Sequence, residues 1–252
     1  MEAPPSAFYG LRVTGIATSV LERFRATAAS AVFGPAGGKS RTLQFALSAA
    51  PKTDPVYAAN SSPLKFWSRA IVEGWMSPVF MAGTFQRVRA TFNNKVLGLC
   101  SAVLATLSRL GWTAQDWDRW TTGTGAEIDL HQVWPGTLGK LVDLGTERAL
   151  MEGLVGSRGL ENLLGPPMLE PIRHAQAQLF REGFKAGGSL LATHVAGGLW
   201  TQYRLYHARS VTTSICQVCQ QSVGDTPHRL FCCDFFPAGS RLPWARCRHA
   251  SW

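Results

Sequence analysis

Acidic side chains, and charged side chains in general, are scarce in this sequence. Asp and Glu together number 16 against 25 Lys and Arg, so the formal net charge of the 252 residues is +9. Charged residues make up 16% and hydrophobic residues 46%, a composition too apolar for a wholly disordered chain. The excess of positive charge favours polyanionic partners, among which RNA or DNA comes first.

Segments that direct a chain into or across a membrane are also lacking. The beginning of the sequence contains Glu2 and two prolines where a secretory signal would have a basic region and an apolar run, and this predicts an intracellular protein. The longest stretch without Asp, Glu, Lys or Arg runs from Ala186 to Tyr203 and includes His194, Gln202 and four glycines. Such a stretch is a poor membrane span, so we expect no membrane partner.

Motifs of common enzyme classes are absent as well. The sequence has no Asp-Asp pair of the polymerase palm type, no His-Glu-x-x-His and no Gly-x-Ser-x-Gly. The acidic residues of the middle section would be the alternative, as a metal-dependent nuclease site, but their places near turns favour a role in capping. These residues are Asp116, Asp118, Glu127 and Asp129. We therefore expect a protein without catalytic activity of its own.

Helical periodicity dominates the remaining pattern and predicts a mainly α fold. Apolar residues recur at steps of three or four from Thr84 to Leu110, which predicts a single long helix there. Residues 9–33 indicate a helix with Arg23 and Arg25 on the side opposite its apolar face, and residues 51–63 indicate a loop. Three more helices are expected at 135–154, 168–185 and 189–209, with a break at Gly187-Gly188.

The one segment with strand character is a short β-hairpin near residues 117–130. Glycines at Gly123 and Gly125 mark its turn, and Ile128 and Leu130 alternate with acidic residues after it. Together with loop signals and charge, this divides the chain into a helical region with the hairpin at 1–155, a helical linker region at 156–210 and a C-terminal region at 211–252. Net charge is +8 over 1–111, −3 over 112–200 and +4 over 201–252.

The C-terminal region carries the strongest chemical signal, the run CQVCQQSVGDTPHRLFCC at 216–233. Cys216 and Cys219 supply two thiolates from one turn, and His228 supplies an imidazole after a Gly-Asp-Thr-Pro turn. Either Cys232 or Cys233 completes a tetrahedral set, and the spacing alone does not choose between them. A closed set of this kind is typical of one structural Zn²⁺.

Arginines and aromatic residues are interleaved around this run. Arginines pair with phosphates and flat rings stack on unpaired bases, so the combination favours single-stranded RNA or DNA. The opposing interpretation is that the rings pack a small zinc module and the arginines only keep it soluble. The residues expected to contact nucleic acid are Arg204, Arg209, Arg229, Trp244 and Arg246.

These residues resemble a known family. The segment from Gly198 through the cysteine-histidine run looks like the zinc-binding segment that follows the reverse transcriptase in non-LTR retrotransposon polyproteins, of the type found in some protists. The segment AFYGLRVTGI at 7–16 is similar to the chain just beyond the polymerase thumb, although Arg12 replaces an acidic residue. The resemblance implies a helical post-thumb connector over 1–155 and implies that a polymerase domain, with its catalytic aspartates, would precede residue 1.

The resemblance also implies the fourth metal ligand, because the family places it four residues beyond the histidine, at Cys233. Asp234 stands here where the family has proline. We therefore expect a nucleic-acid-binding zinc-knuckle region that lacks the polymerase active site. The alternative is a protein-interaction scaffold, in which the zinc is purely structural and the helices bind a protein partner.

Overall fold

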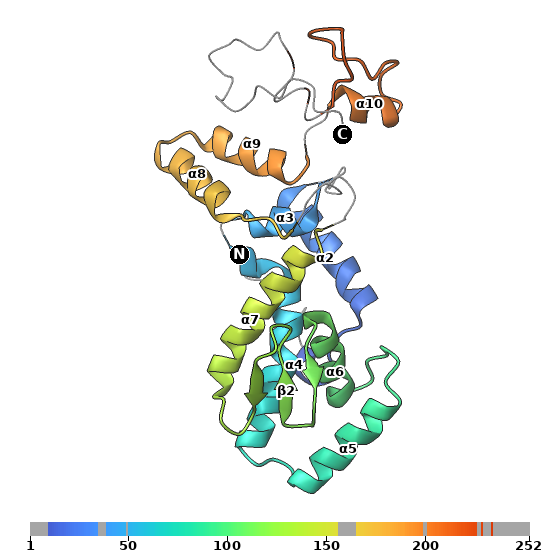
Figure 1. The fold of residues 1–252 in the computed structure, drawn as a ribbon, viewed down its shortest axis with the longest axis vertical. Coiled ribbons are helices and arrows are strands. Elements are labelled where there is room, and N and C mark those ends of the chain that lie inside the picture. Colours follow the sequence, from blue (N-terminus) through green and yellow to red (C-terminus); the bar gives the residue numbers. More distant parts are fainter. Residues whose placement is uncertain are drawn as a thin grey trace. The chain divides into compact units, whose positions relative to one another are not determined.

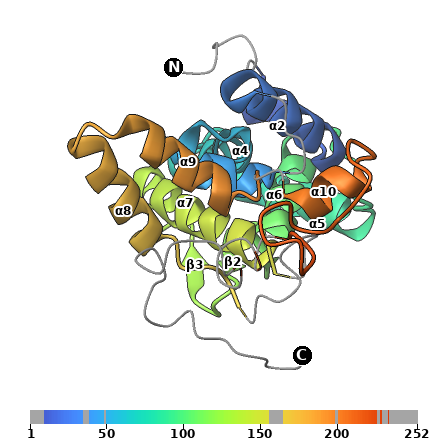
Figure 2. The same cartoon turned by 90° about the horizontal axis from the view of Figure 1, so that it is seen from above.

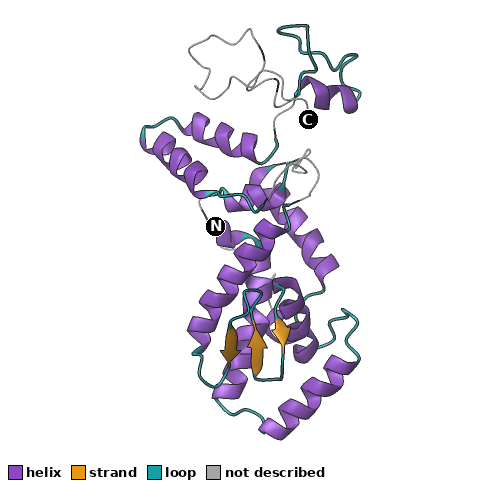
Figure 3. Cartoon of the chain, in the orientation of Figure 1, coloured by secondary structure: helices purple, strands orange, loops and turns teal. Residues whose placement is uncertain are grey.

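The computed structural model describes residues 10–34, 39–48, 50–155, 165–198, 201–225, 228 and 233. The chain divides into two compact units, Met1–Gly197 and Gly198–Trp252. Helices predominate in the described residues, as Figure 3 shows by colour, and this confirms the mainly α prediction. None of the described helices has both the length and the apolar character that crossing a bilayer requires.

The first unit is built around the helix α4, Pro55–Val72, which packs against four other helices of the unit. Side chains at the starts of several helices cap them: Ser40, Asp54 and Ser77 each accept a hydrogen bond from a backbone N–H of the first turn. The first described helix of the unit is the short α1, Leu11–Thr14. Figure 1 labels further helices of the unit, α2 Thr18–Phe33, α3 Arg41–Ala46, α5 Pro78–Ala90, α6 Leu99–Leu110 and α7 Pro135–Glu152. A 3₁₀ turn, η2, covers Pro51–Thr53.

A small antiparallel sheet follows α6 and confirms the predicted hairpin. Its central strand β2, Arg119–Thr121, pairs with β3, Glu127–Asp129, so that Trp120 lies opposite Ile128. A further strand not predicted from the sequence, β1 at Thr113–Ala114, pairs with the other edge of β2. Ile128 and Leu130 are buried, which confirms the predicted alternation of inward apolar and outward acidic residues.

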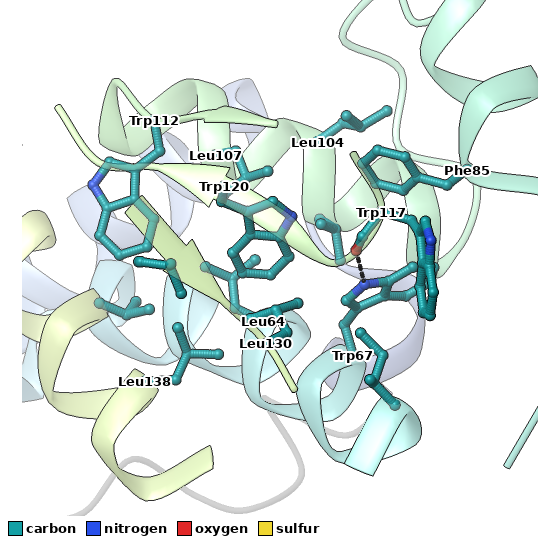
Figure 4. Packing of buried hydrophobic residues seen from close by; sticks show 14 of the residues in the cluster. Leu64, Trp67, Phe85, Leu104, Leu107, Trp112, Trp117, Trp120, Leu130 and Leu138 are labelled. Carbon is teal, nitrogen blue, oxygen red and sulfur yellow. Dashed lines mark hydrogen bonds between the residues drawn. The ribbon is translucent and has the colours of Figure 1, made fainter. Parts of the chain in front are cut away.

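The main hydrophobic core lies where the sheet meets α4, α6 and α7. Trp120 is fully buried at its centre, and the indole Nε1 of Trp67 donates a hydrogen bond of 2.8 Å to the backbone oxygen of Trp117 (Figure 4). Of the tryptophans that the structure describes, those at positions 67, 112, 117 and 120 are buried, whereas Trp75 and Trp134 are exposed. Large aromatic side chains therefore supply much of the buried apolar area of this unit.

The single helix predicted over Thr84–Leu110 is wrong. The chain forms two helices, α5 and α6, separated by residues 91–98, where Asn94 has a φ of 66° and Gly98 a φ of 159°. Both angles lie outside the right-handed helical region. The apolar rhythm persists across the break because both helices pack against the same core cluster.

Proline and glycine signals misled two other assignments. The loop predicted over 51–63 contains the first half of α4, in which Pro63 lies inside the helix. The predicted break at Gly187-Gly188 lies inside α9, Lys185–Val195, and the chain turns instead at Gly183, which has a φ of 80° after α8, Glu170–Arg181. Figure 2 shows α8 and α9 side by side as a helical hairpin.

The predicted helix at 9–33 is divided at Gly15, and Arg25 is buried rather than on a solvated side. Arg25 lies one turn after the buried Leu21, so it shares the inward face of α2. An added Cβ at Gly15 would lie 2.3 Å from the Cβ of Ala102, so close approach to α6 requires a glycine at this position. Its φ of 63° has the same consequence.

Candidate metal centre

The second unit contains one helix among its described residues, α10 at Gln202–His207, followed by a tight loop. The loop residues Ile215 and Val223 form an antiparallel bridge. Within it, the backbone N–H of Cys216 donates to the oxygen of Ser222 at 2.8 Å, and the N–H of Gln220 donates to the oxygen of Cys216 at 2.9 Å. These bonds fold Cys216 and Cys219 into one turn.

Four predicted ligand residues come together at this turn. Ligand atoms of Cys216, Cys219, His228 and Cys233 all lie within 4.8 Å of one another, and all four residues are buried. The Nε2 atom of His228 lies 3.2 Å from the Sγ atom of Cys219. The four side chains are therefore close enough to hold one metal ion.

Backbone hydrogen bonds bring the second pair of ligands to the first. The N–H of Cys233 donates to the oxygen of His228 at 2.8 Å, a bond that spans five residues and places the two side by side. The carboxylate Oδ1 of Asp225 accepts the N–H of His228 at 2.8 Å. Of the two cysteines that the spacing left open, Cys233 belongs to the cluster, while Cys232 lies outside the described residues.

The environment of the first two thiols favours their deprotonated form. Burial acts to raise the pKa of the Cys216 thiol, yet N–H groups of Cys219 and Val218 donate to its sulfur and leave the pKa below its ordinary value. The N–H of Gln221 likewise holds the pKa of Cys219 below its ordinary value, helped by the N–H of Ser222. Thiolates are the form that binds metal ions.

Helix α10 is fastened to the metal-ligand loop by its first residues. The N–H of Tyr203 donates to the oxygen of Gly224 at 3.2 Å, and the side-chain amide of Gln202 donates to the oxygen of Thr213 at 3.0 Å. An added Cβ at Gly224 would lie 2.7 Å from the Cβ of Gln202, so the loop and the helix approach closely. No sequence pattern predicts this Gln202 contact, because a glutamine amide and a threonine backbone oxygen carry no motif.

The structure describes two of the five residues predicted to contact nucleic acid. Arg204 lies within α10, and Arg209 follows it and is exposed. The predicted contacts Arg229, Trp244 and Arg246 lie outside the described residues. Two exposed tyrosines not named among the predicted contacts, Tyr203 and Tyr206, flank the His207 ring at centroid distances of 4.3 and 5.5 Å.

The middle carboxylates take local roles in the first unit. Asp116 accepts the N–H of Trp117 at 2.7 Å, Asp129 accepts the N–H of His131 at 2.9 Å, and Asp118 lies 3.2 Å from the His131 ring. Within the described part of the chain, the cysteine-histidine cluster is the one group of three or more potential ligands gathered closely enough for a metal ion. Asp116 and Asp129 thus cap local turns, and Asp118 pairs with the His131 ring.

Comparison with known proteins found no match for this chain among family models, curated proteins or solved structures.

Proposed function

We propose that the second unit binds one structural Zn²⁺ through Cys216, Cys219, His228 and Cys233. The observation that carries this proposal is the convergence of three sulfurs and one imidazole nitrogen in a buried cluster. Soft thiolate ligands with an imidazole favour Zn²⁺ in tetrahedral coordination, and four protein ligands leave no open position for substrate. A structural role follows from this closed ligand set.

Metal analysis of purified full-length protein tests the zinc assignment. We expect one zinc per chain in the wild type and in Cys100→Ser, because the Cys100 thiol belongs to the first unit and is not among the four ligands. Cys219→Ser and His228→Asn should each lose most of the bound zinc. Substoichiometric zinc in the wild type, or full zinc in both ligand variants, would contradict the assignment.

We further propose that the zinc-folded unit binds single-stranded RNA or DNA. The N–H and side-chain bonds of Tyr203 and Gln202 fix α10 on the ligand loop and leave Tyr203, Tyr206 and Arg209 exposed. Rings of this kind stack on unpaired bases, and arginine pairs with phosphate. The net charge of +4 over residues 201–252 adds attraction for a polyanion.

Fluorescence anisotropy with labelled twenty-nucleotide RNA and DNA strands tests this function. If about four phosphates are neutralised, log affinity should fall with log salt at a slope of about −3. Arg209→Gln and Tyr206→Ala should weaken binding, whereas Lys140→Gln, which removes an exposed cation of the first unit, should not. Affinity that does not depend on salt, or that Lys140→Gln lowers as much as Arg209→Gln does, would refute the proposal.

One observation favours the alternative role in protein interaction. Residues 72–80, where α4 ends and α5 begins, are all exposed, and several of them are large and apolar. Exposed apolar residues gathered together are typical of protein contact sites. These residues are Val72, Trp75, Met76, Val79 and Phe80.

The two roles differ in how they respond to substitution of this corner. If the chain acts as a scaffold, Val79→Ser with Phe80→Ser should abolish its binding to a protein partner, and Arg209→Gln should leave that binding unchanged. If nucleic-acid binding is the function, the same double variant should bind labelled strands with wild-type affinity, and Arg209→Gln should lower that affinity.

A further inference from the structure

A pocket of about 350 Å³ lies in the first unit between α5, α6 and the residues that connect them. Its size falls within the range of about 300–1,000 Å³ that is usual for small-molecule sites. The break that separates α5 from α6 forms part of its wall, through Asn93, Lys95 and Gly98. The departure from a single long helix therefore creates this pocket.

The surroundings of the pocket carry positive charge. The sequence contains no Asp or Glu between Glu73 and Asp116, and none of the residues that line the pocket is acidic. Lys95 is exposed and lies in the lining, and Arg87 projects from α5 one turn before the lining residue Thr91. This distribution of charge favours an anionic ligand.

The start of helix α6 in the pocket wall also favours an anionic ligand. The residues of the first turn of α6, Leu99, Cys100 and Ser101, line the pocket, and no acidic side chain occupies that turn. The Ser101 hydroxyl is already occupied, because it accepts from the N–H groups of Leu97 and Gly98. The start of a helix favours negative charge.

Thr84 on α5 forms a further part of the wall. Its Oγ1 atom is buried and has no hydrogen-bond partner in the described structure, and the residue lines the pocket. The hydroxyl lies below the accessible surface of the wall, so Thr84 contributes shape to the pocket rather than a hydrogen bond to a ligand.

Apolar side chains form the rest of the wall. Val88, Phe92 and Leu99 line the pocket and rest against the main core cluster, which holds them in place. The pocket thus joins an apolar wall to a cationic, hydrogen-bonding rim. A ligand that matches it has a flat apolar part and an anionic group.

We propose that this pocket binds a nucleotide, with the phosphate near Lys95 and the start of α6 and the base against Phe92. The nucleotide is either free or part of a single strand, since both present a phosphate and a base. The inference goes beyond the proposed function, because the pocket belongs to the first unit and uses none of the metal ligands.

Isothermal titration of the full-length, zinc-loaded protein with AMP, adenosine and inorganic phosphate tests the proposal. AMP should bind more tightly than either of the other two, because only AMP offers both groups. Equal affinity for AMP and phosphate, or no binding of AMP, would overturn the assignment to a nucleotide.

Two substitutions locate the site. Lys95→Gln removes the cation and should weaken AMP binding tenfold or more, since charge-assisted bonds to phosphate are strong. Phe92→Leu removes the ring that faces the proposed base and should weaken it severalfold. Lys140→Gln is the matched control, and an equal loss in that variant would refute the site.

Chemical footprinting keeps the test independent of binding enthalpy. Cys100 lines the pocket and is half-buried, so AMP should slow its alkylation by iodoacetamide, read at the peptide that contains it. Unchanged alkylation at saturating AMP would count against binding in this pocket.

A chelator and a short strand complete the design. Removal of zinc with a chelator should leave AMP binding intact, because the pocket uses none of the metal ligands. Loss of strand binding by the second unit and loss of AMP binding by this pocket are therefore separate results. Loss of AMP binding together with zinc would contradict the proposal. Binding of a twelve-nucleotide oligoadenylate shows whether the ligand is a free nucleotide or part of a strand. If nucleotides of a strand enter the pocket, Lys95→Gln should weaken binding of the oligoadenylate. If the ligand is a free nucleotide, Lys95→Gln should weaken AMP binding only.

Discussion

The carboxylate of Asp54 binds the guanidinium of Arg25 in the interior of the first unit. Arg25 Nε lies 2.9 and 3.2 Å from the two carboxylate oxygens, and Nη2 lies 2.7 Å from Oδ2. The residues are only 5% and 1% exposed. Asp54 also accepts the N–H of Val56 and thereby caps α4, so the pair joins α2 to the start of the central helix.

Removing one partner of this pair should be costly. Asp54→Ala leaves the buried guanidinium with Glu22, a half-exposed partner 2.9 Å from Nη1, as its remaining carboxylate, and is expected to lower the free energy of unfolding by about 3 kcal/mol. Glu152→Ala, which breaks the exposed pair with Arg148, should cost no more than about 1 kcal/mol. Urea unfolding followed by circular dichroism measures both, and equal small losses would show that the buried pair is energetically unimportant.

The hydrogen bond from Trp67 to the backbone of Trp117 gives a second prediction. Trp67→Phe keeps the ring in the core but leaves the buried oxygen of Trp117 without its donor, which should cost about 1–3 kcal/mol of unfolding free energy. Trp134→Phe is the matched control, because Trp134 is 71% exposed, and its unfolding midpoint should not change. If the two variants have the same free energy of unfolding, the hydrogen bond makes no net contribution to stability.

Local patterns predicted the secondary-structure types better than the positions of their breaks. The hairpin at 117–130 was predictable because alternation and the glycine turn lie within fourteen residues. The break between α5 and α6 was not, because Phe92 and Leu99 keep the helical rhythm while Asn94 leaves the helical conformation. Pro63 stays helical because packing of the central helix outweighs its local preference.

Sites made by residues close in sequence were likewise easier to predict than contacts between distant residues. The metal ligands lie within eighteen residues and their spacing reflects local turns, so Cys216, Cys219 and His228 could be proposed from spacing alone. The spacing left Cys232 and Cys233 open, and only the family resemblance favoured Cys233. The Arg25–Asp54 pair joins residues that are 29 apart, and no local pattern indicates which carboxylate a given arginine meets. The buried Thr84 hydroxyl likewise depends on packing between α5 and its neighbours.

Tyr57 predicts how the first unit responds to alkaline pH. Burial, helped by the nearby carboxylates of Glu147 and Asp54, raises the pKa of the phenol to about 12 from its ordinary value of 10.0. Below pH 10.0 the phenol is protonated in both states; between there and about 12 only the unfolded chain loses the proton, which favours unfolding. Its contribution to stability is thus complete below the lower value and lost as pH rises through the upper one.

Comparison with Tyr57→Phe isolates this contribution from the other groups that titrate at high pH. The variant cannot ionise at this position, so its stability should fall less than that of the wild type between pH 10 and 12. Urea midpoints measured across that range test the point. Parallel curves for the two proteins would show that the phenol does not contribute.

Zinc affinity should depend on substitution at one backbone position of the metal-ligand loop and not at another. Gly224→Ala places a Cβ 2.7 Å from Gln202 and 3.1 Å from the Cα of Cys216, so we expect zinc affinity to fall about tenfold. Gln220 has a φ of 57°, a conformation that favours glycine, so Gln220→Gly should retain wild-type affinity. Competition with a chromophoric chelator ranks the three proteins, and a loss in Gln220→Gly as large as that in Gly224→Ala would contradict this account of the loop.

Chelation should unfold the second unit and spare the first. Among the described residues of the second unit, the buried apolar cluster consists of the metal-ligand cysteines Cys216, Cys219 and Cys233 themselves. Zinc binding can supply about 10 kcal/mol or more of folding free energy, and no other cluster in this described part replaces it. The first unit has its own core around Trp120 and Leu138 and includes none of these ligands. Hydrogen exchange followed by mass spectrometry should therefore show faster exchange over 201–225 after chelation and unchanged exchange over α4, α6 and α7. Slow exchange of both units in excess chelator would mean that packing, rather than the metal, holds the loop and α10 together.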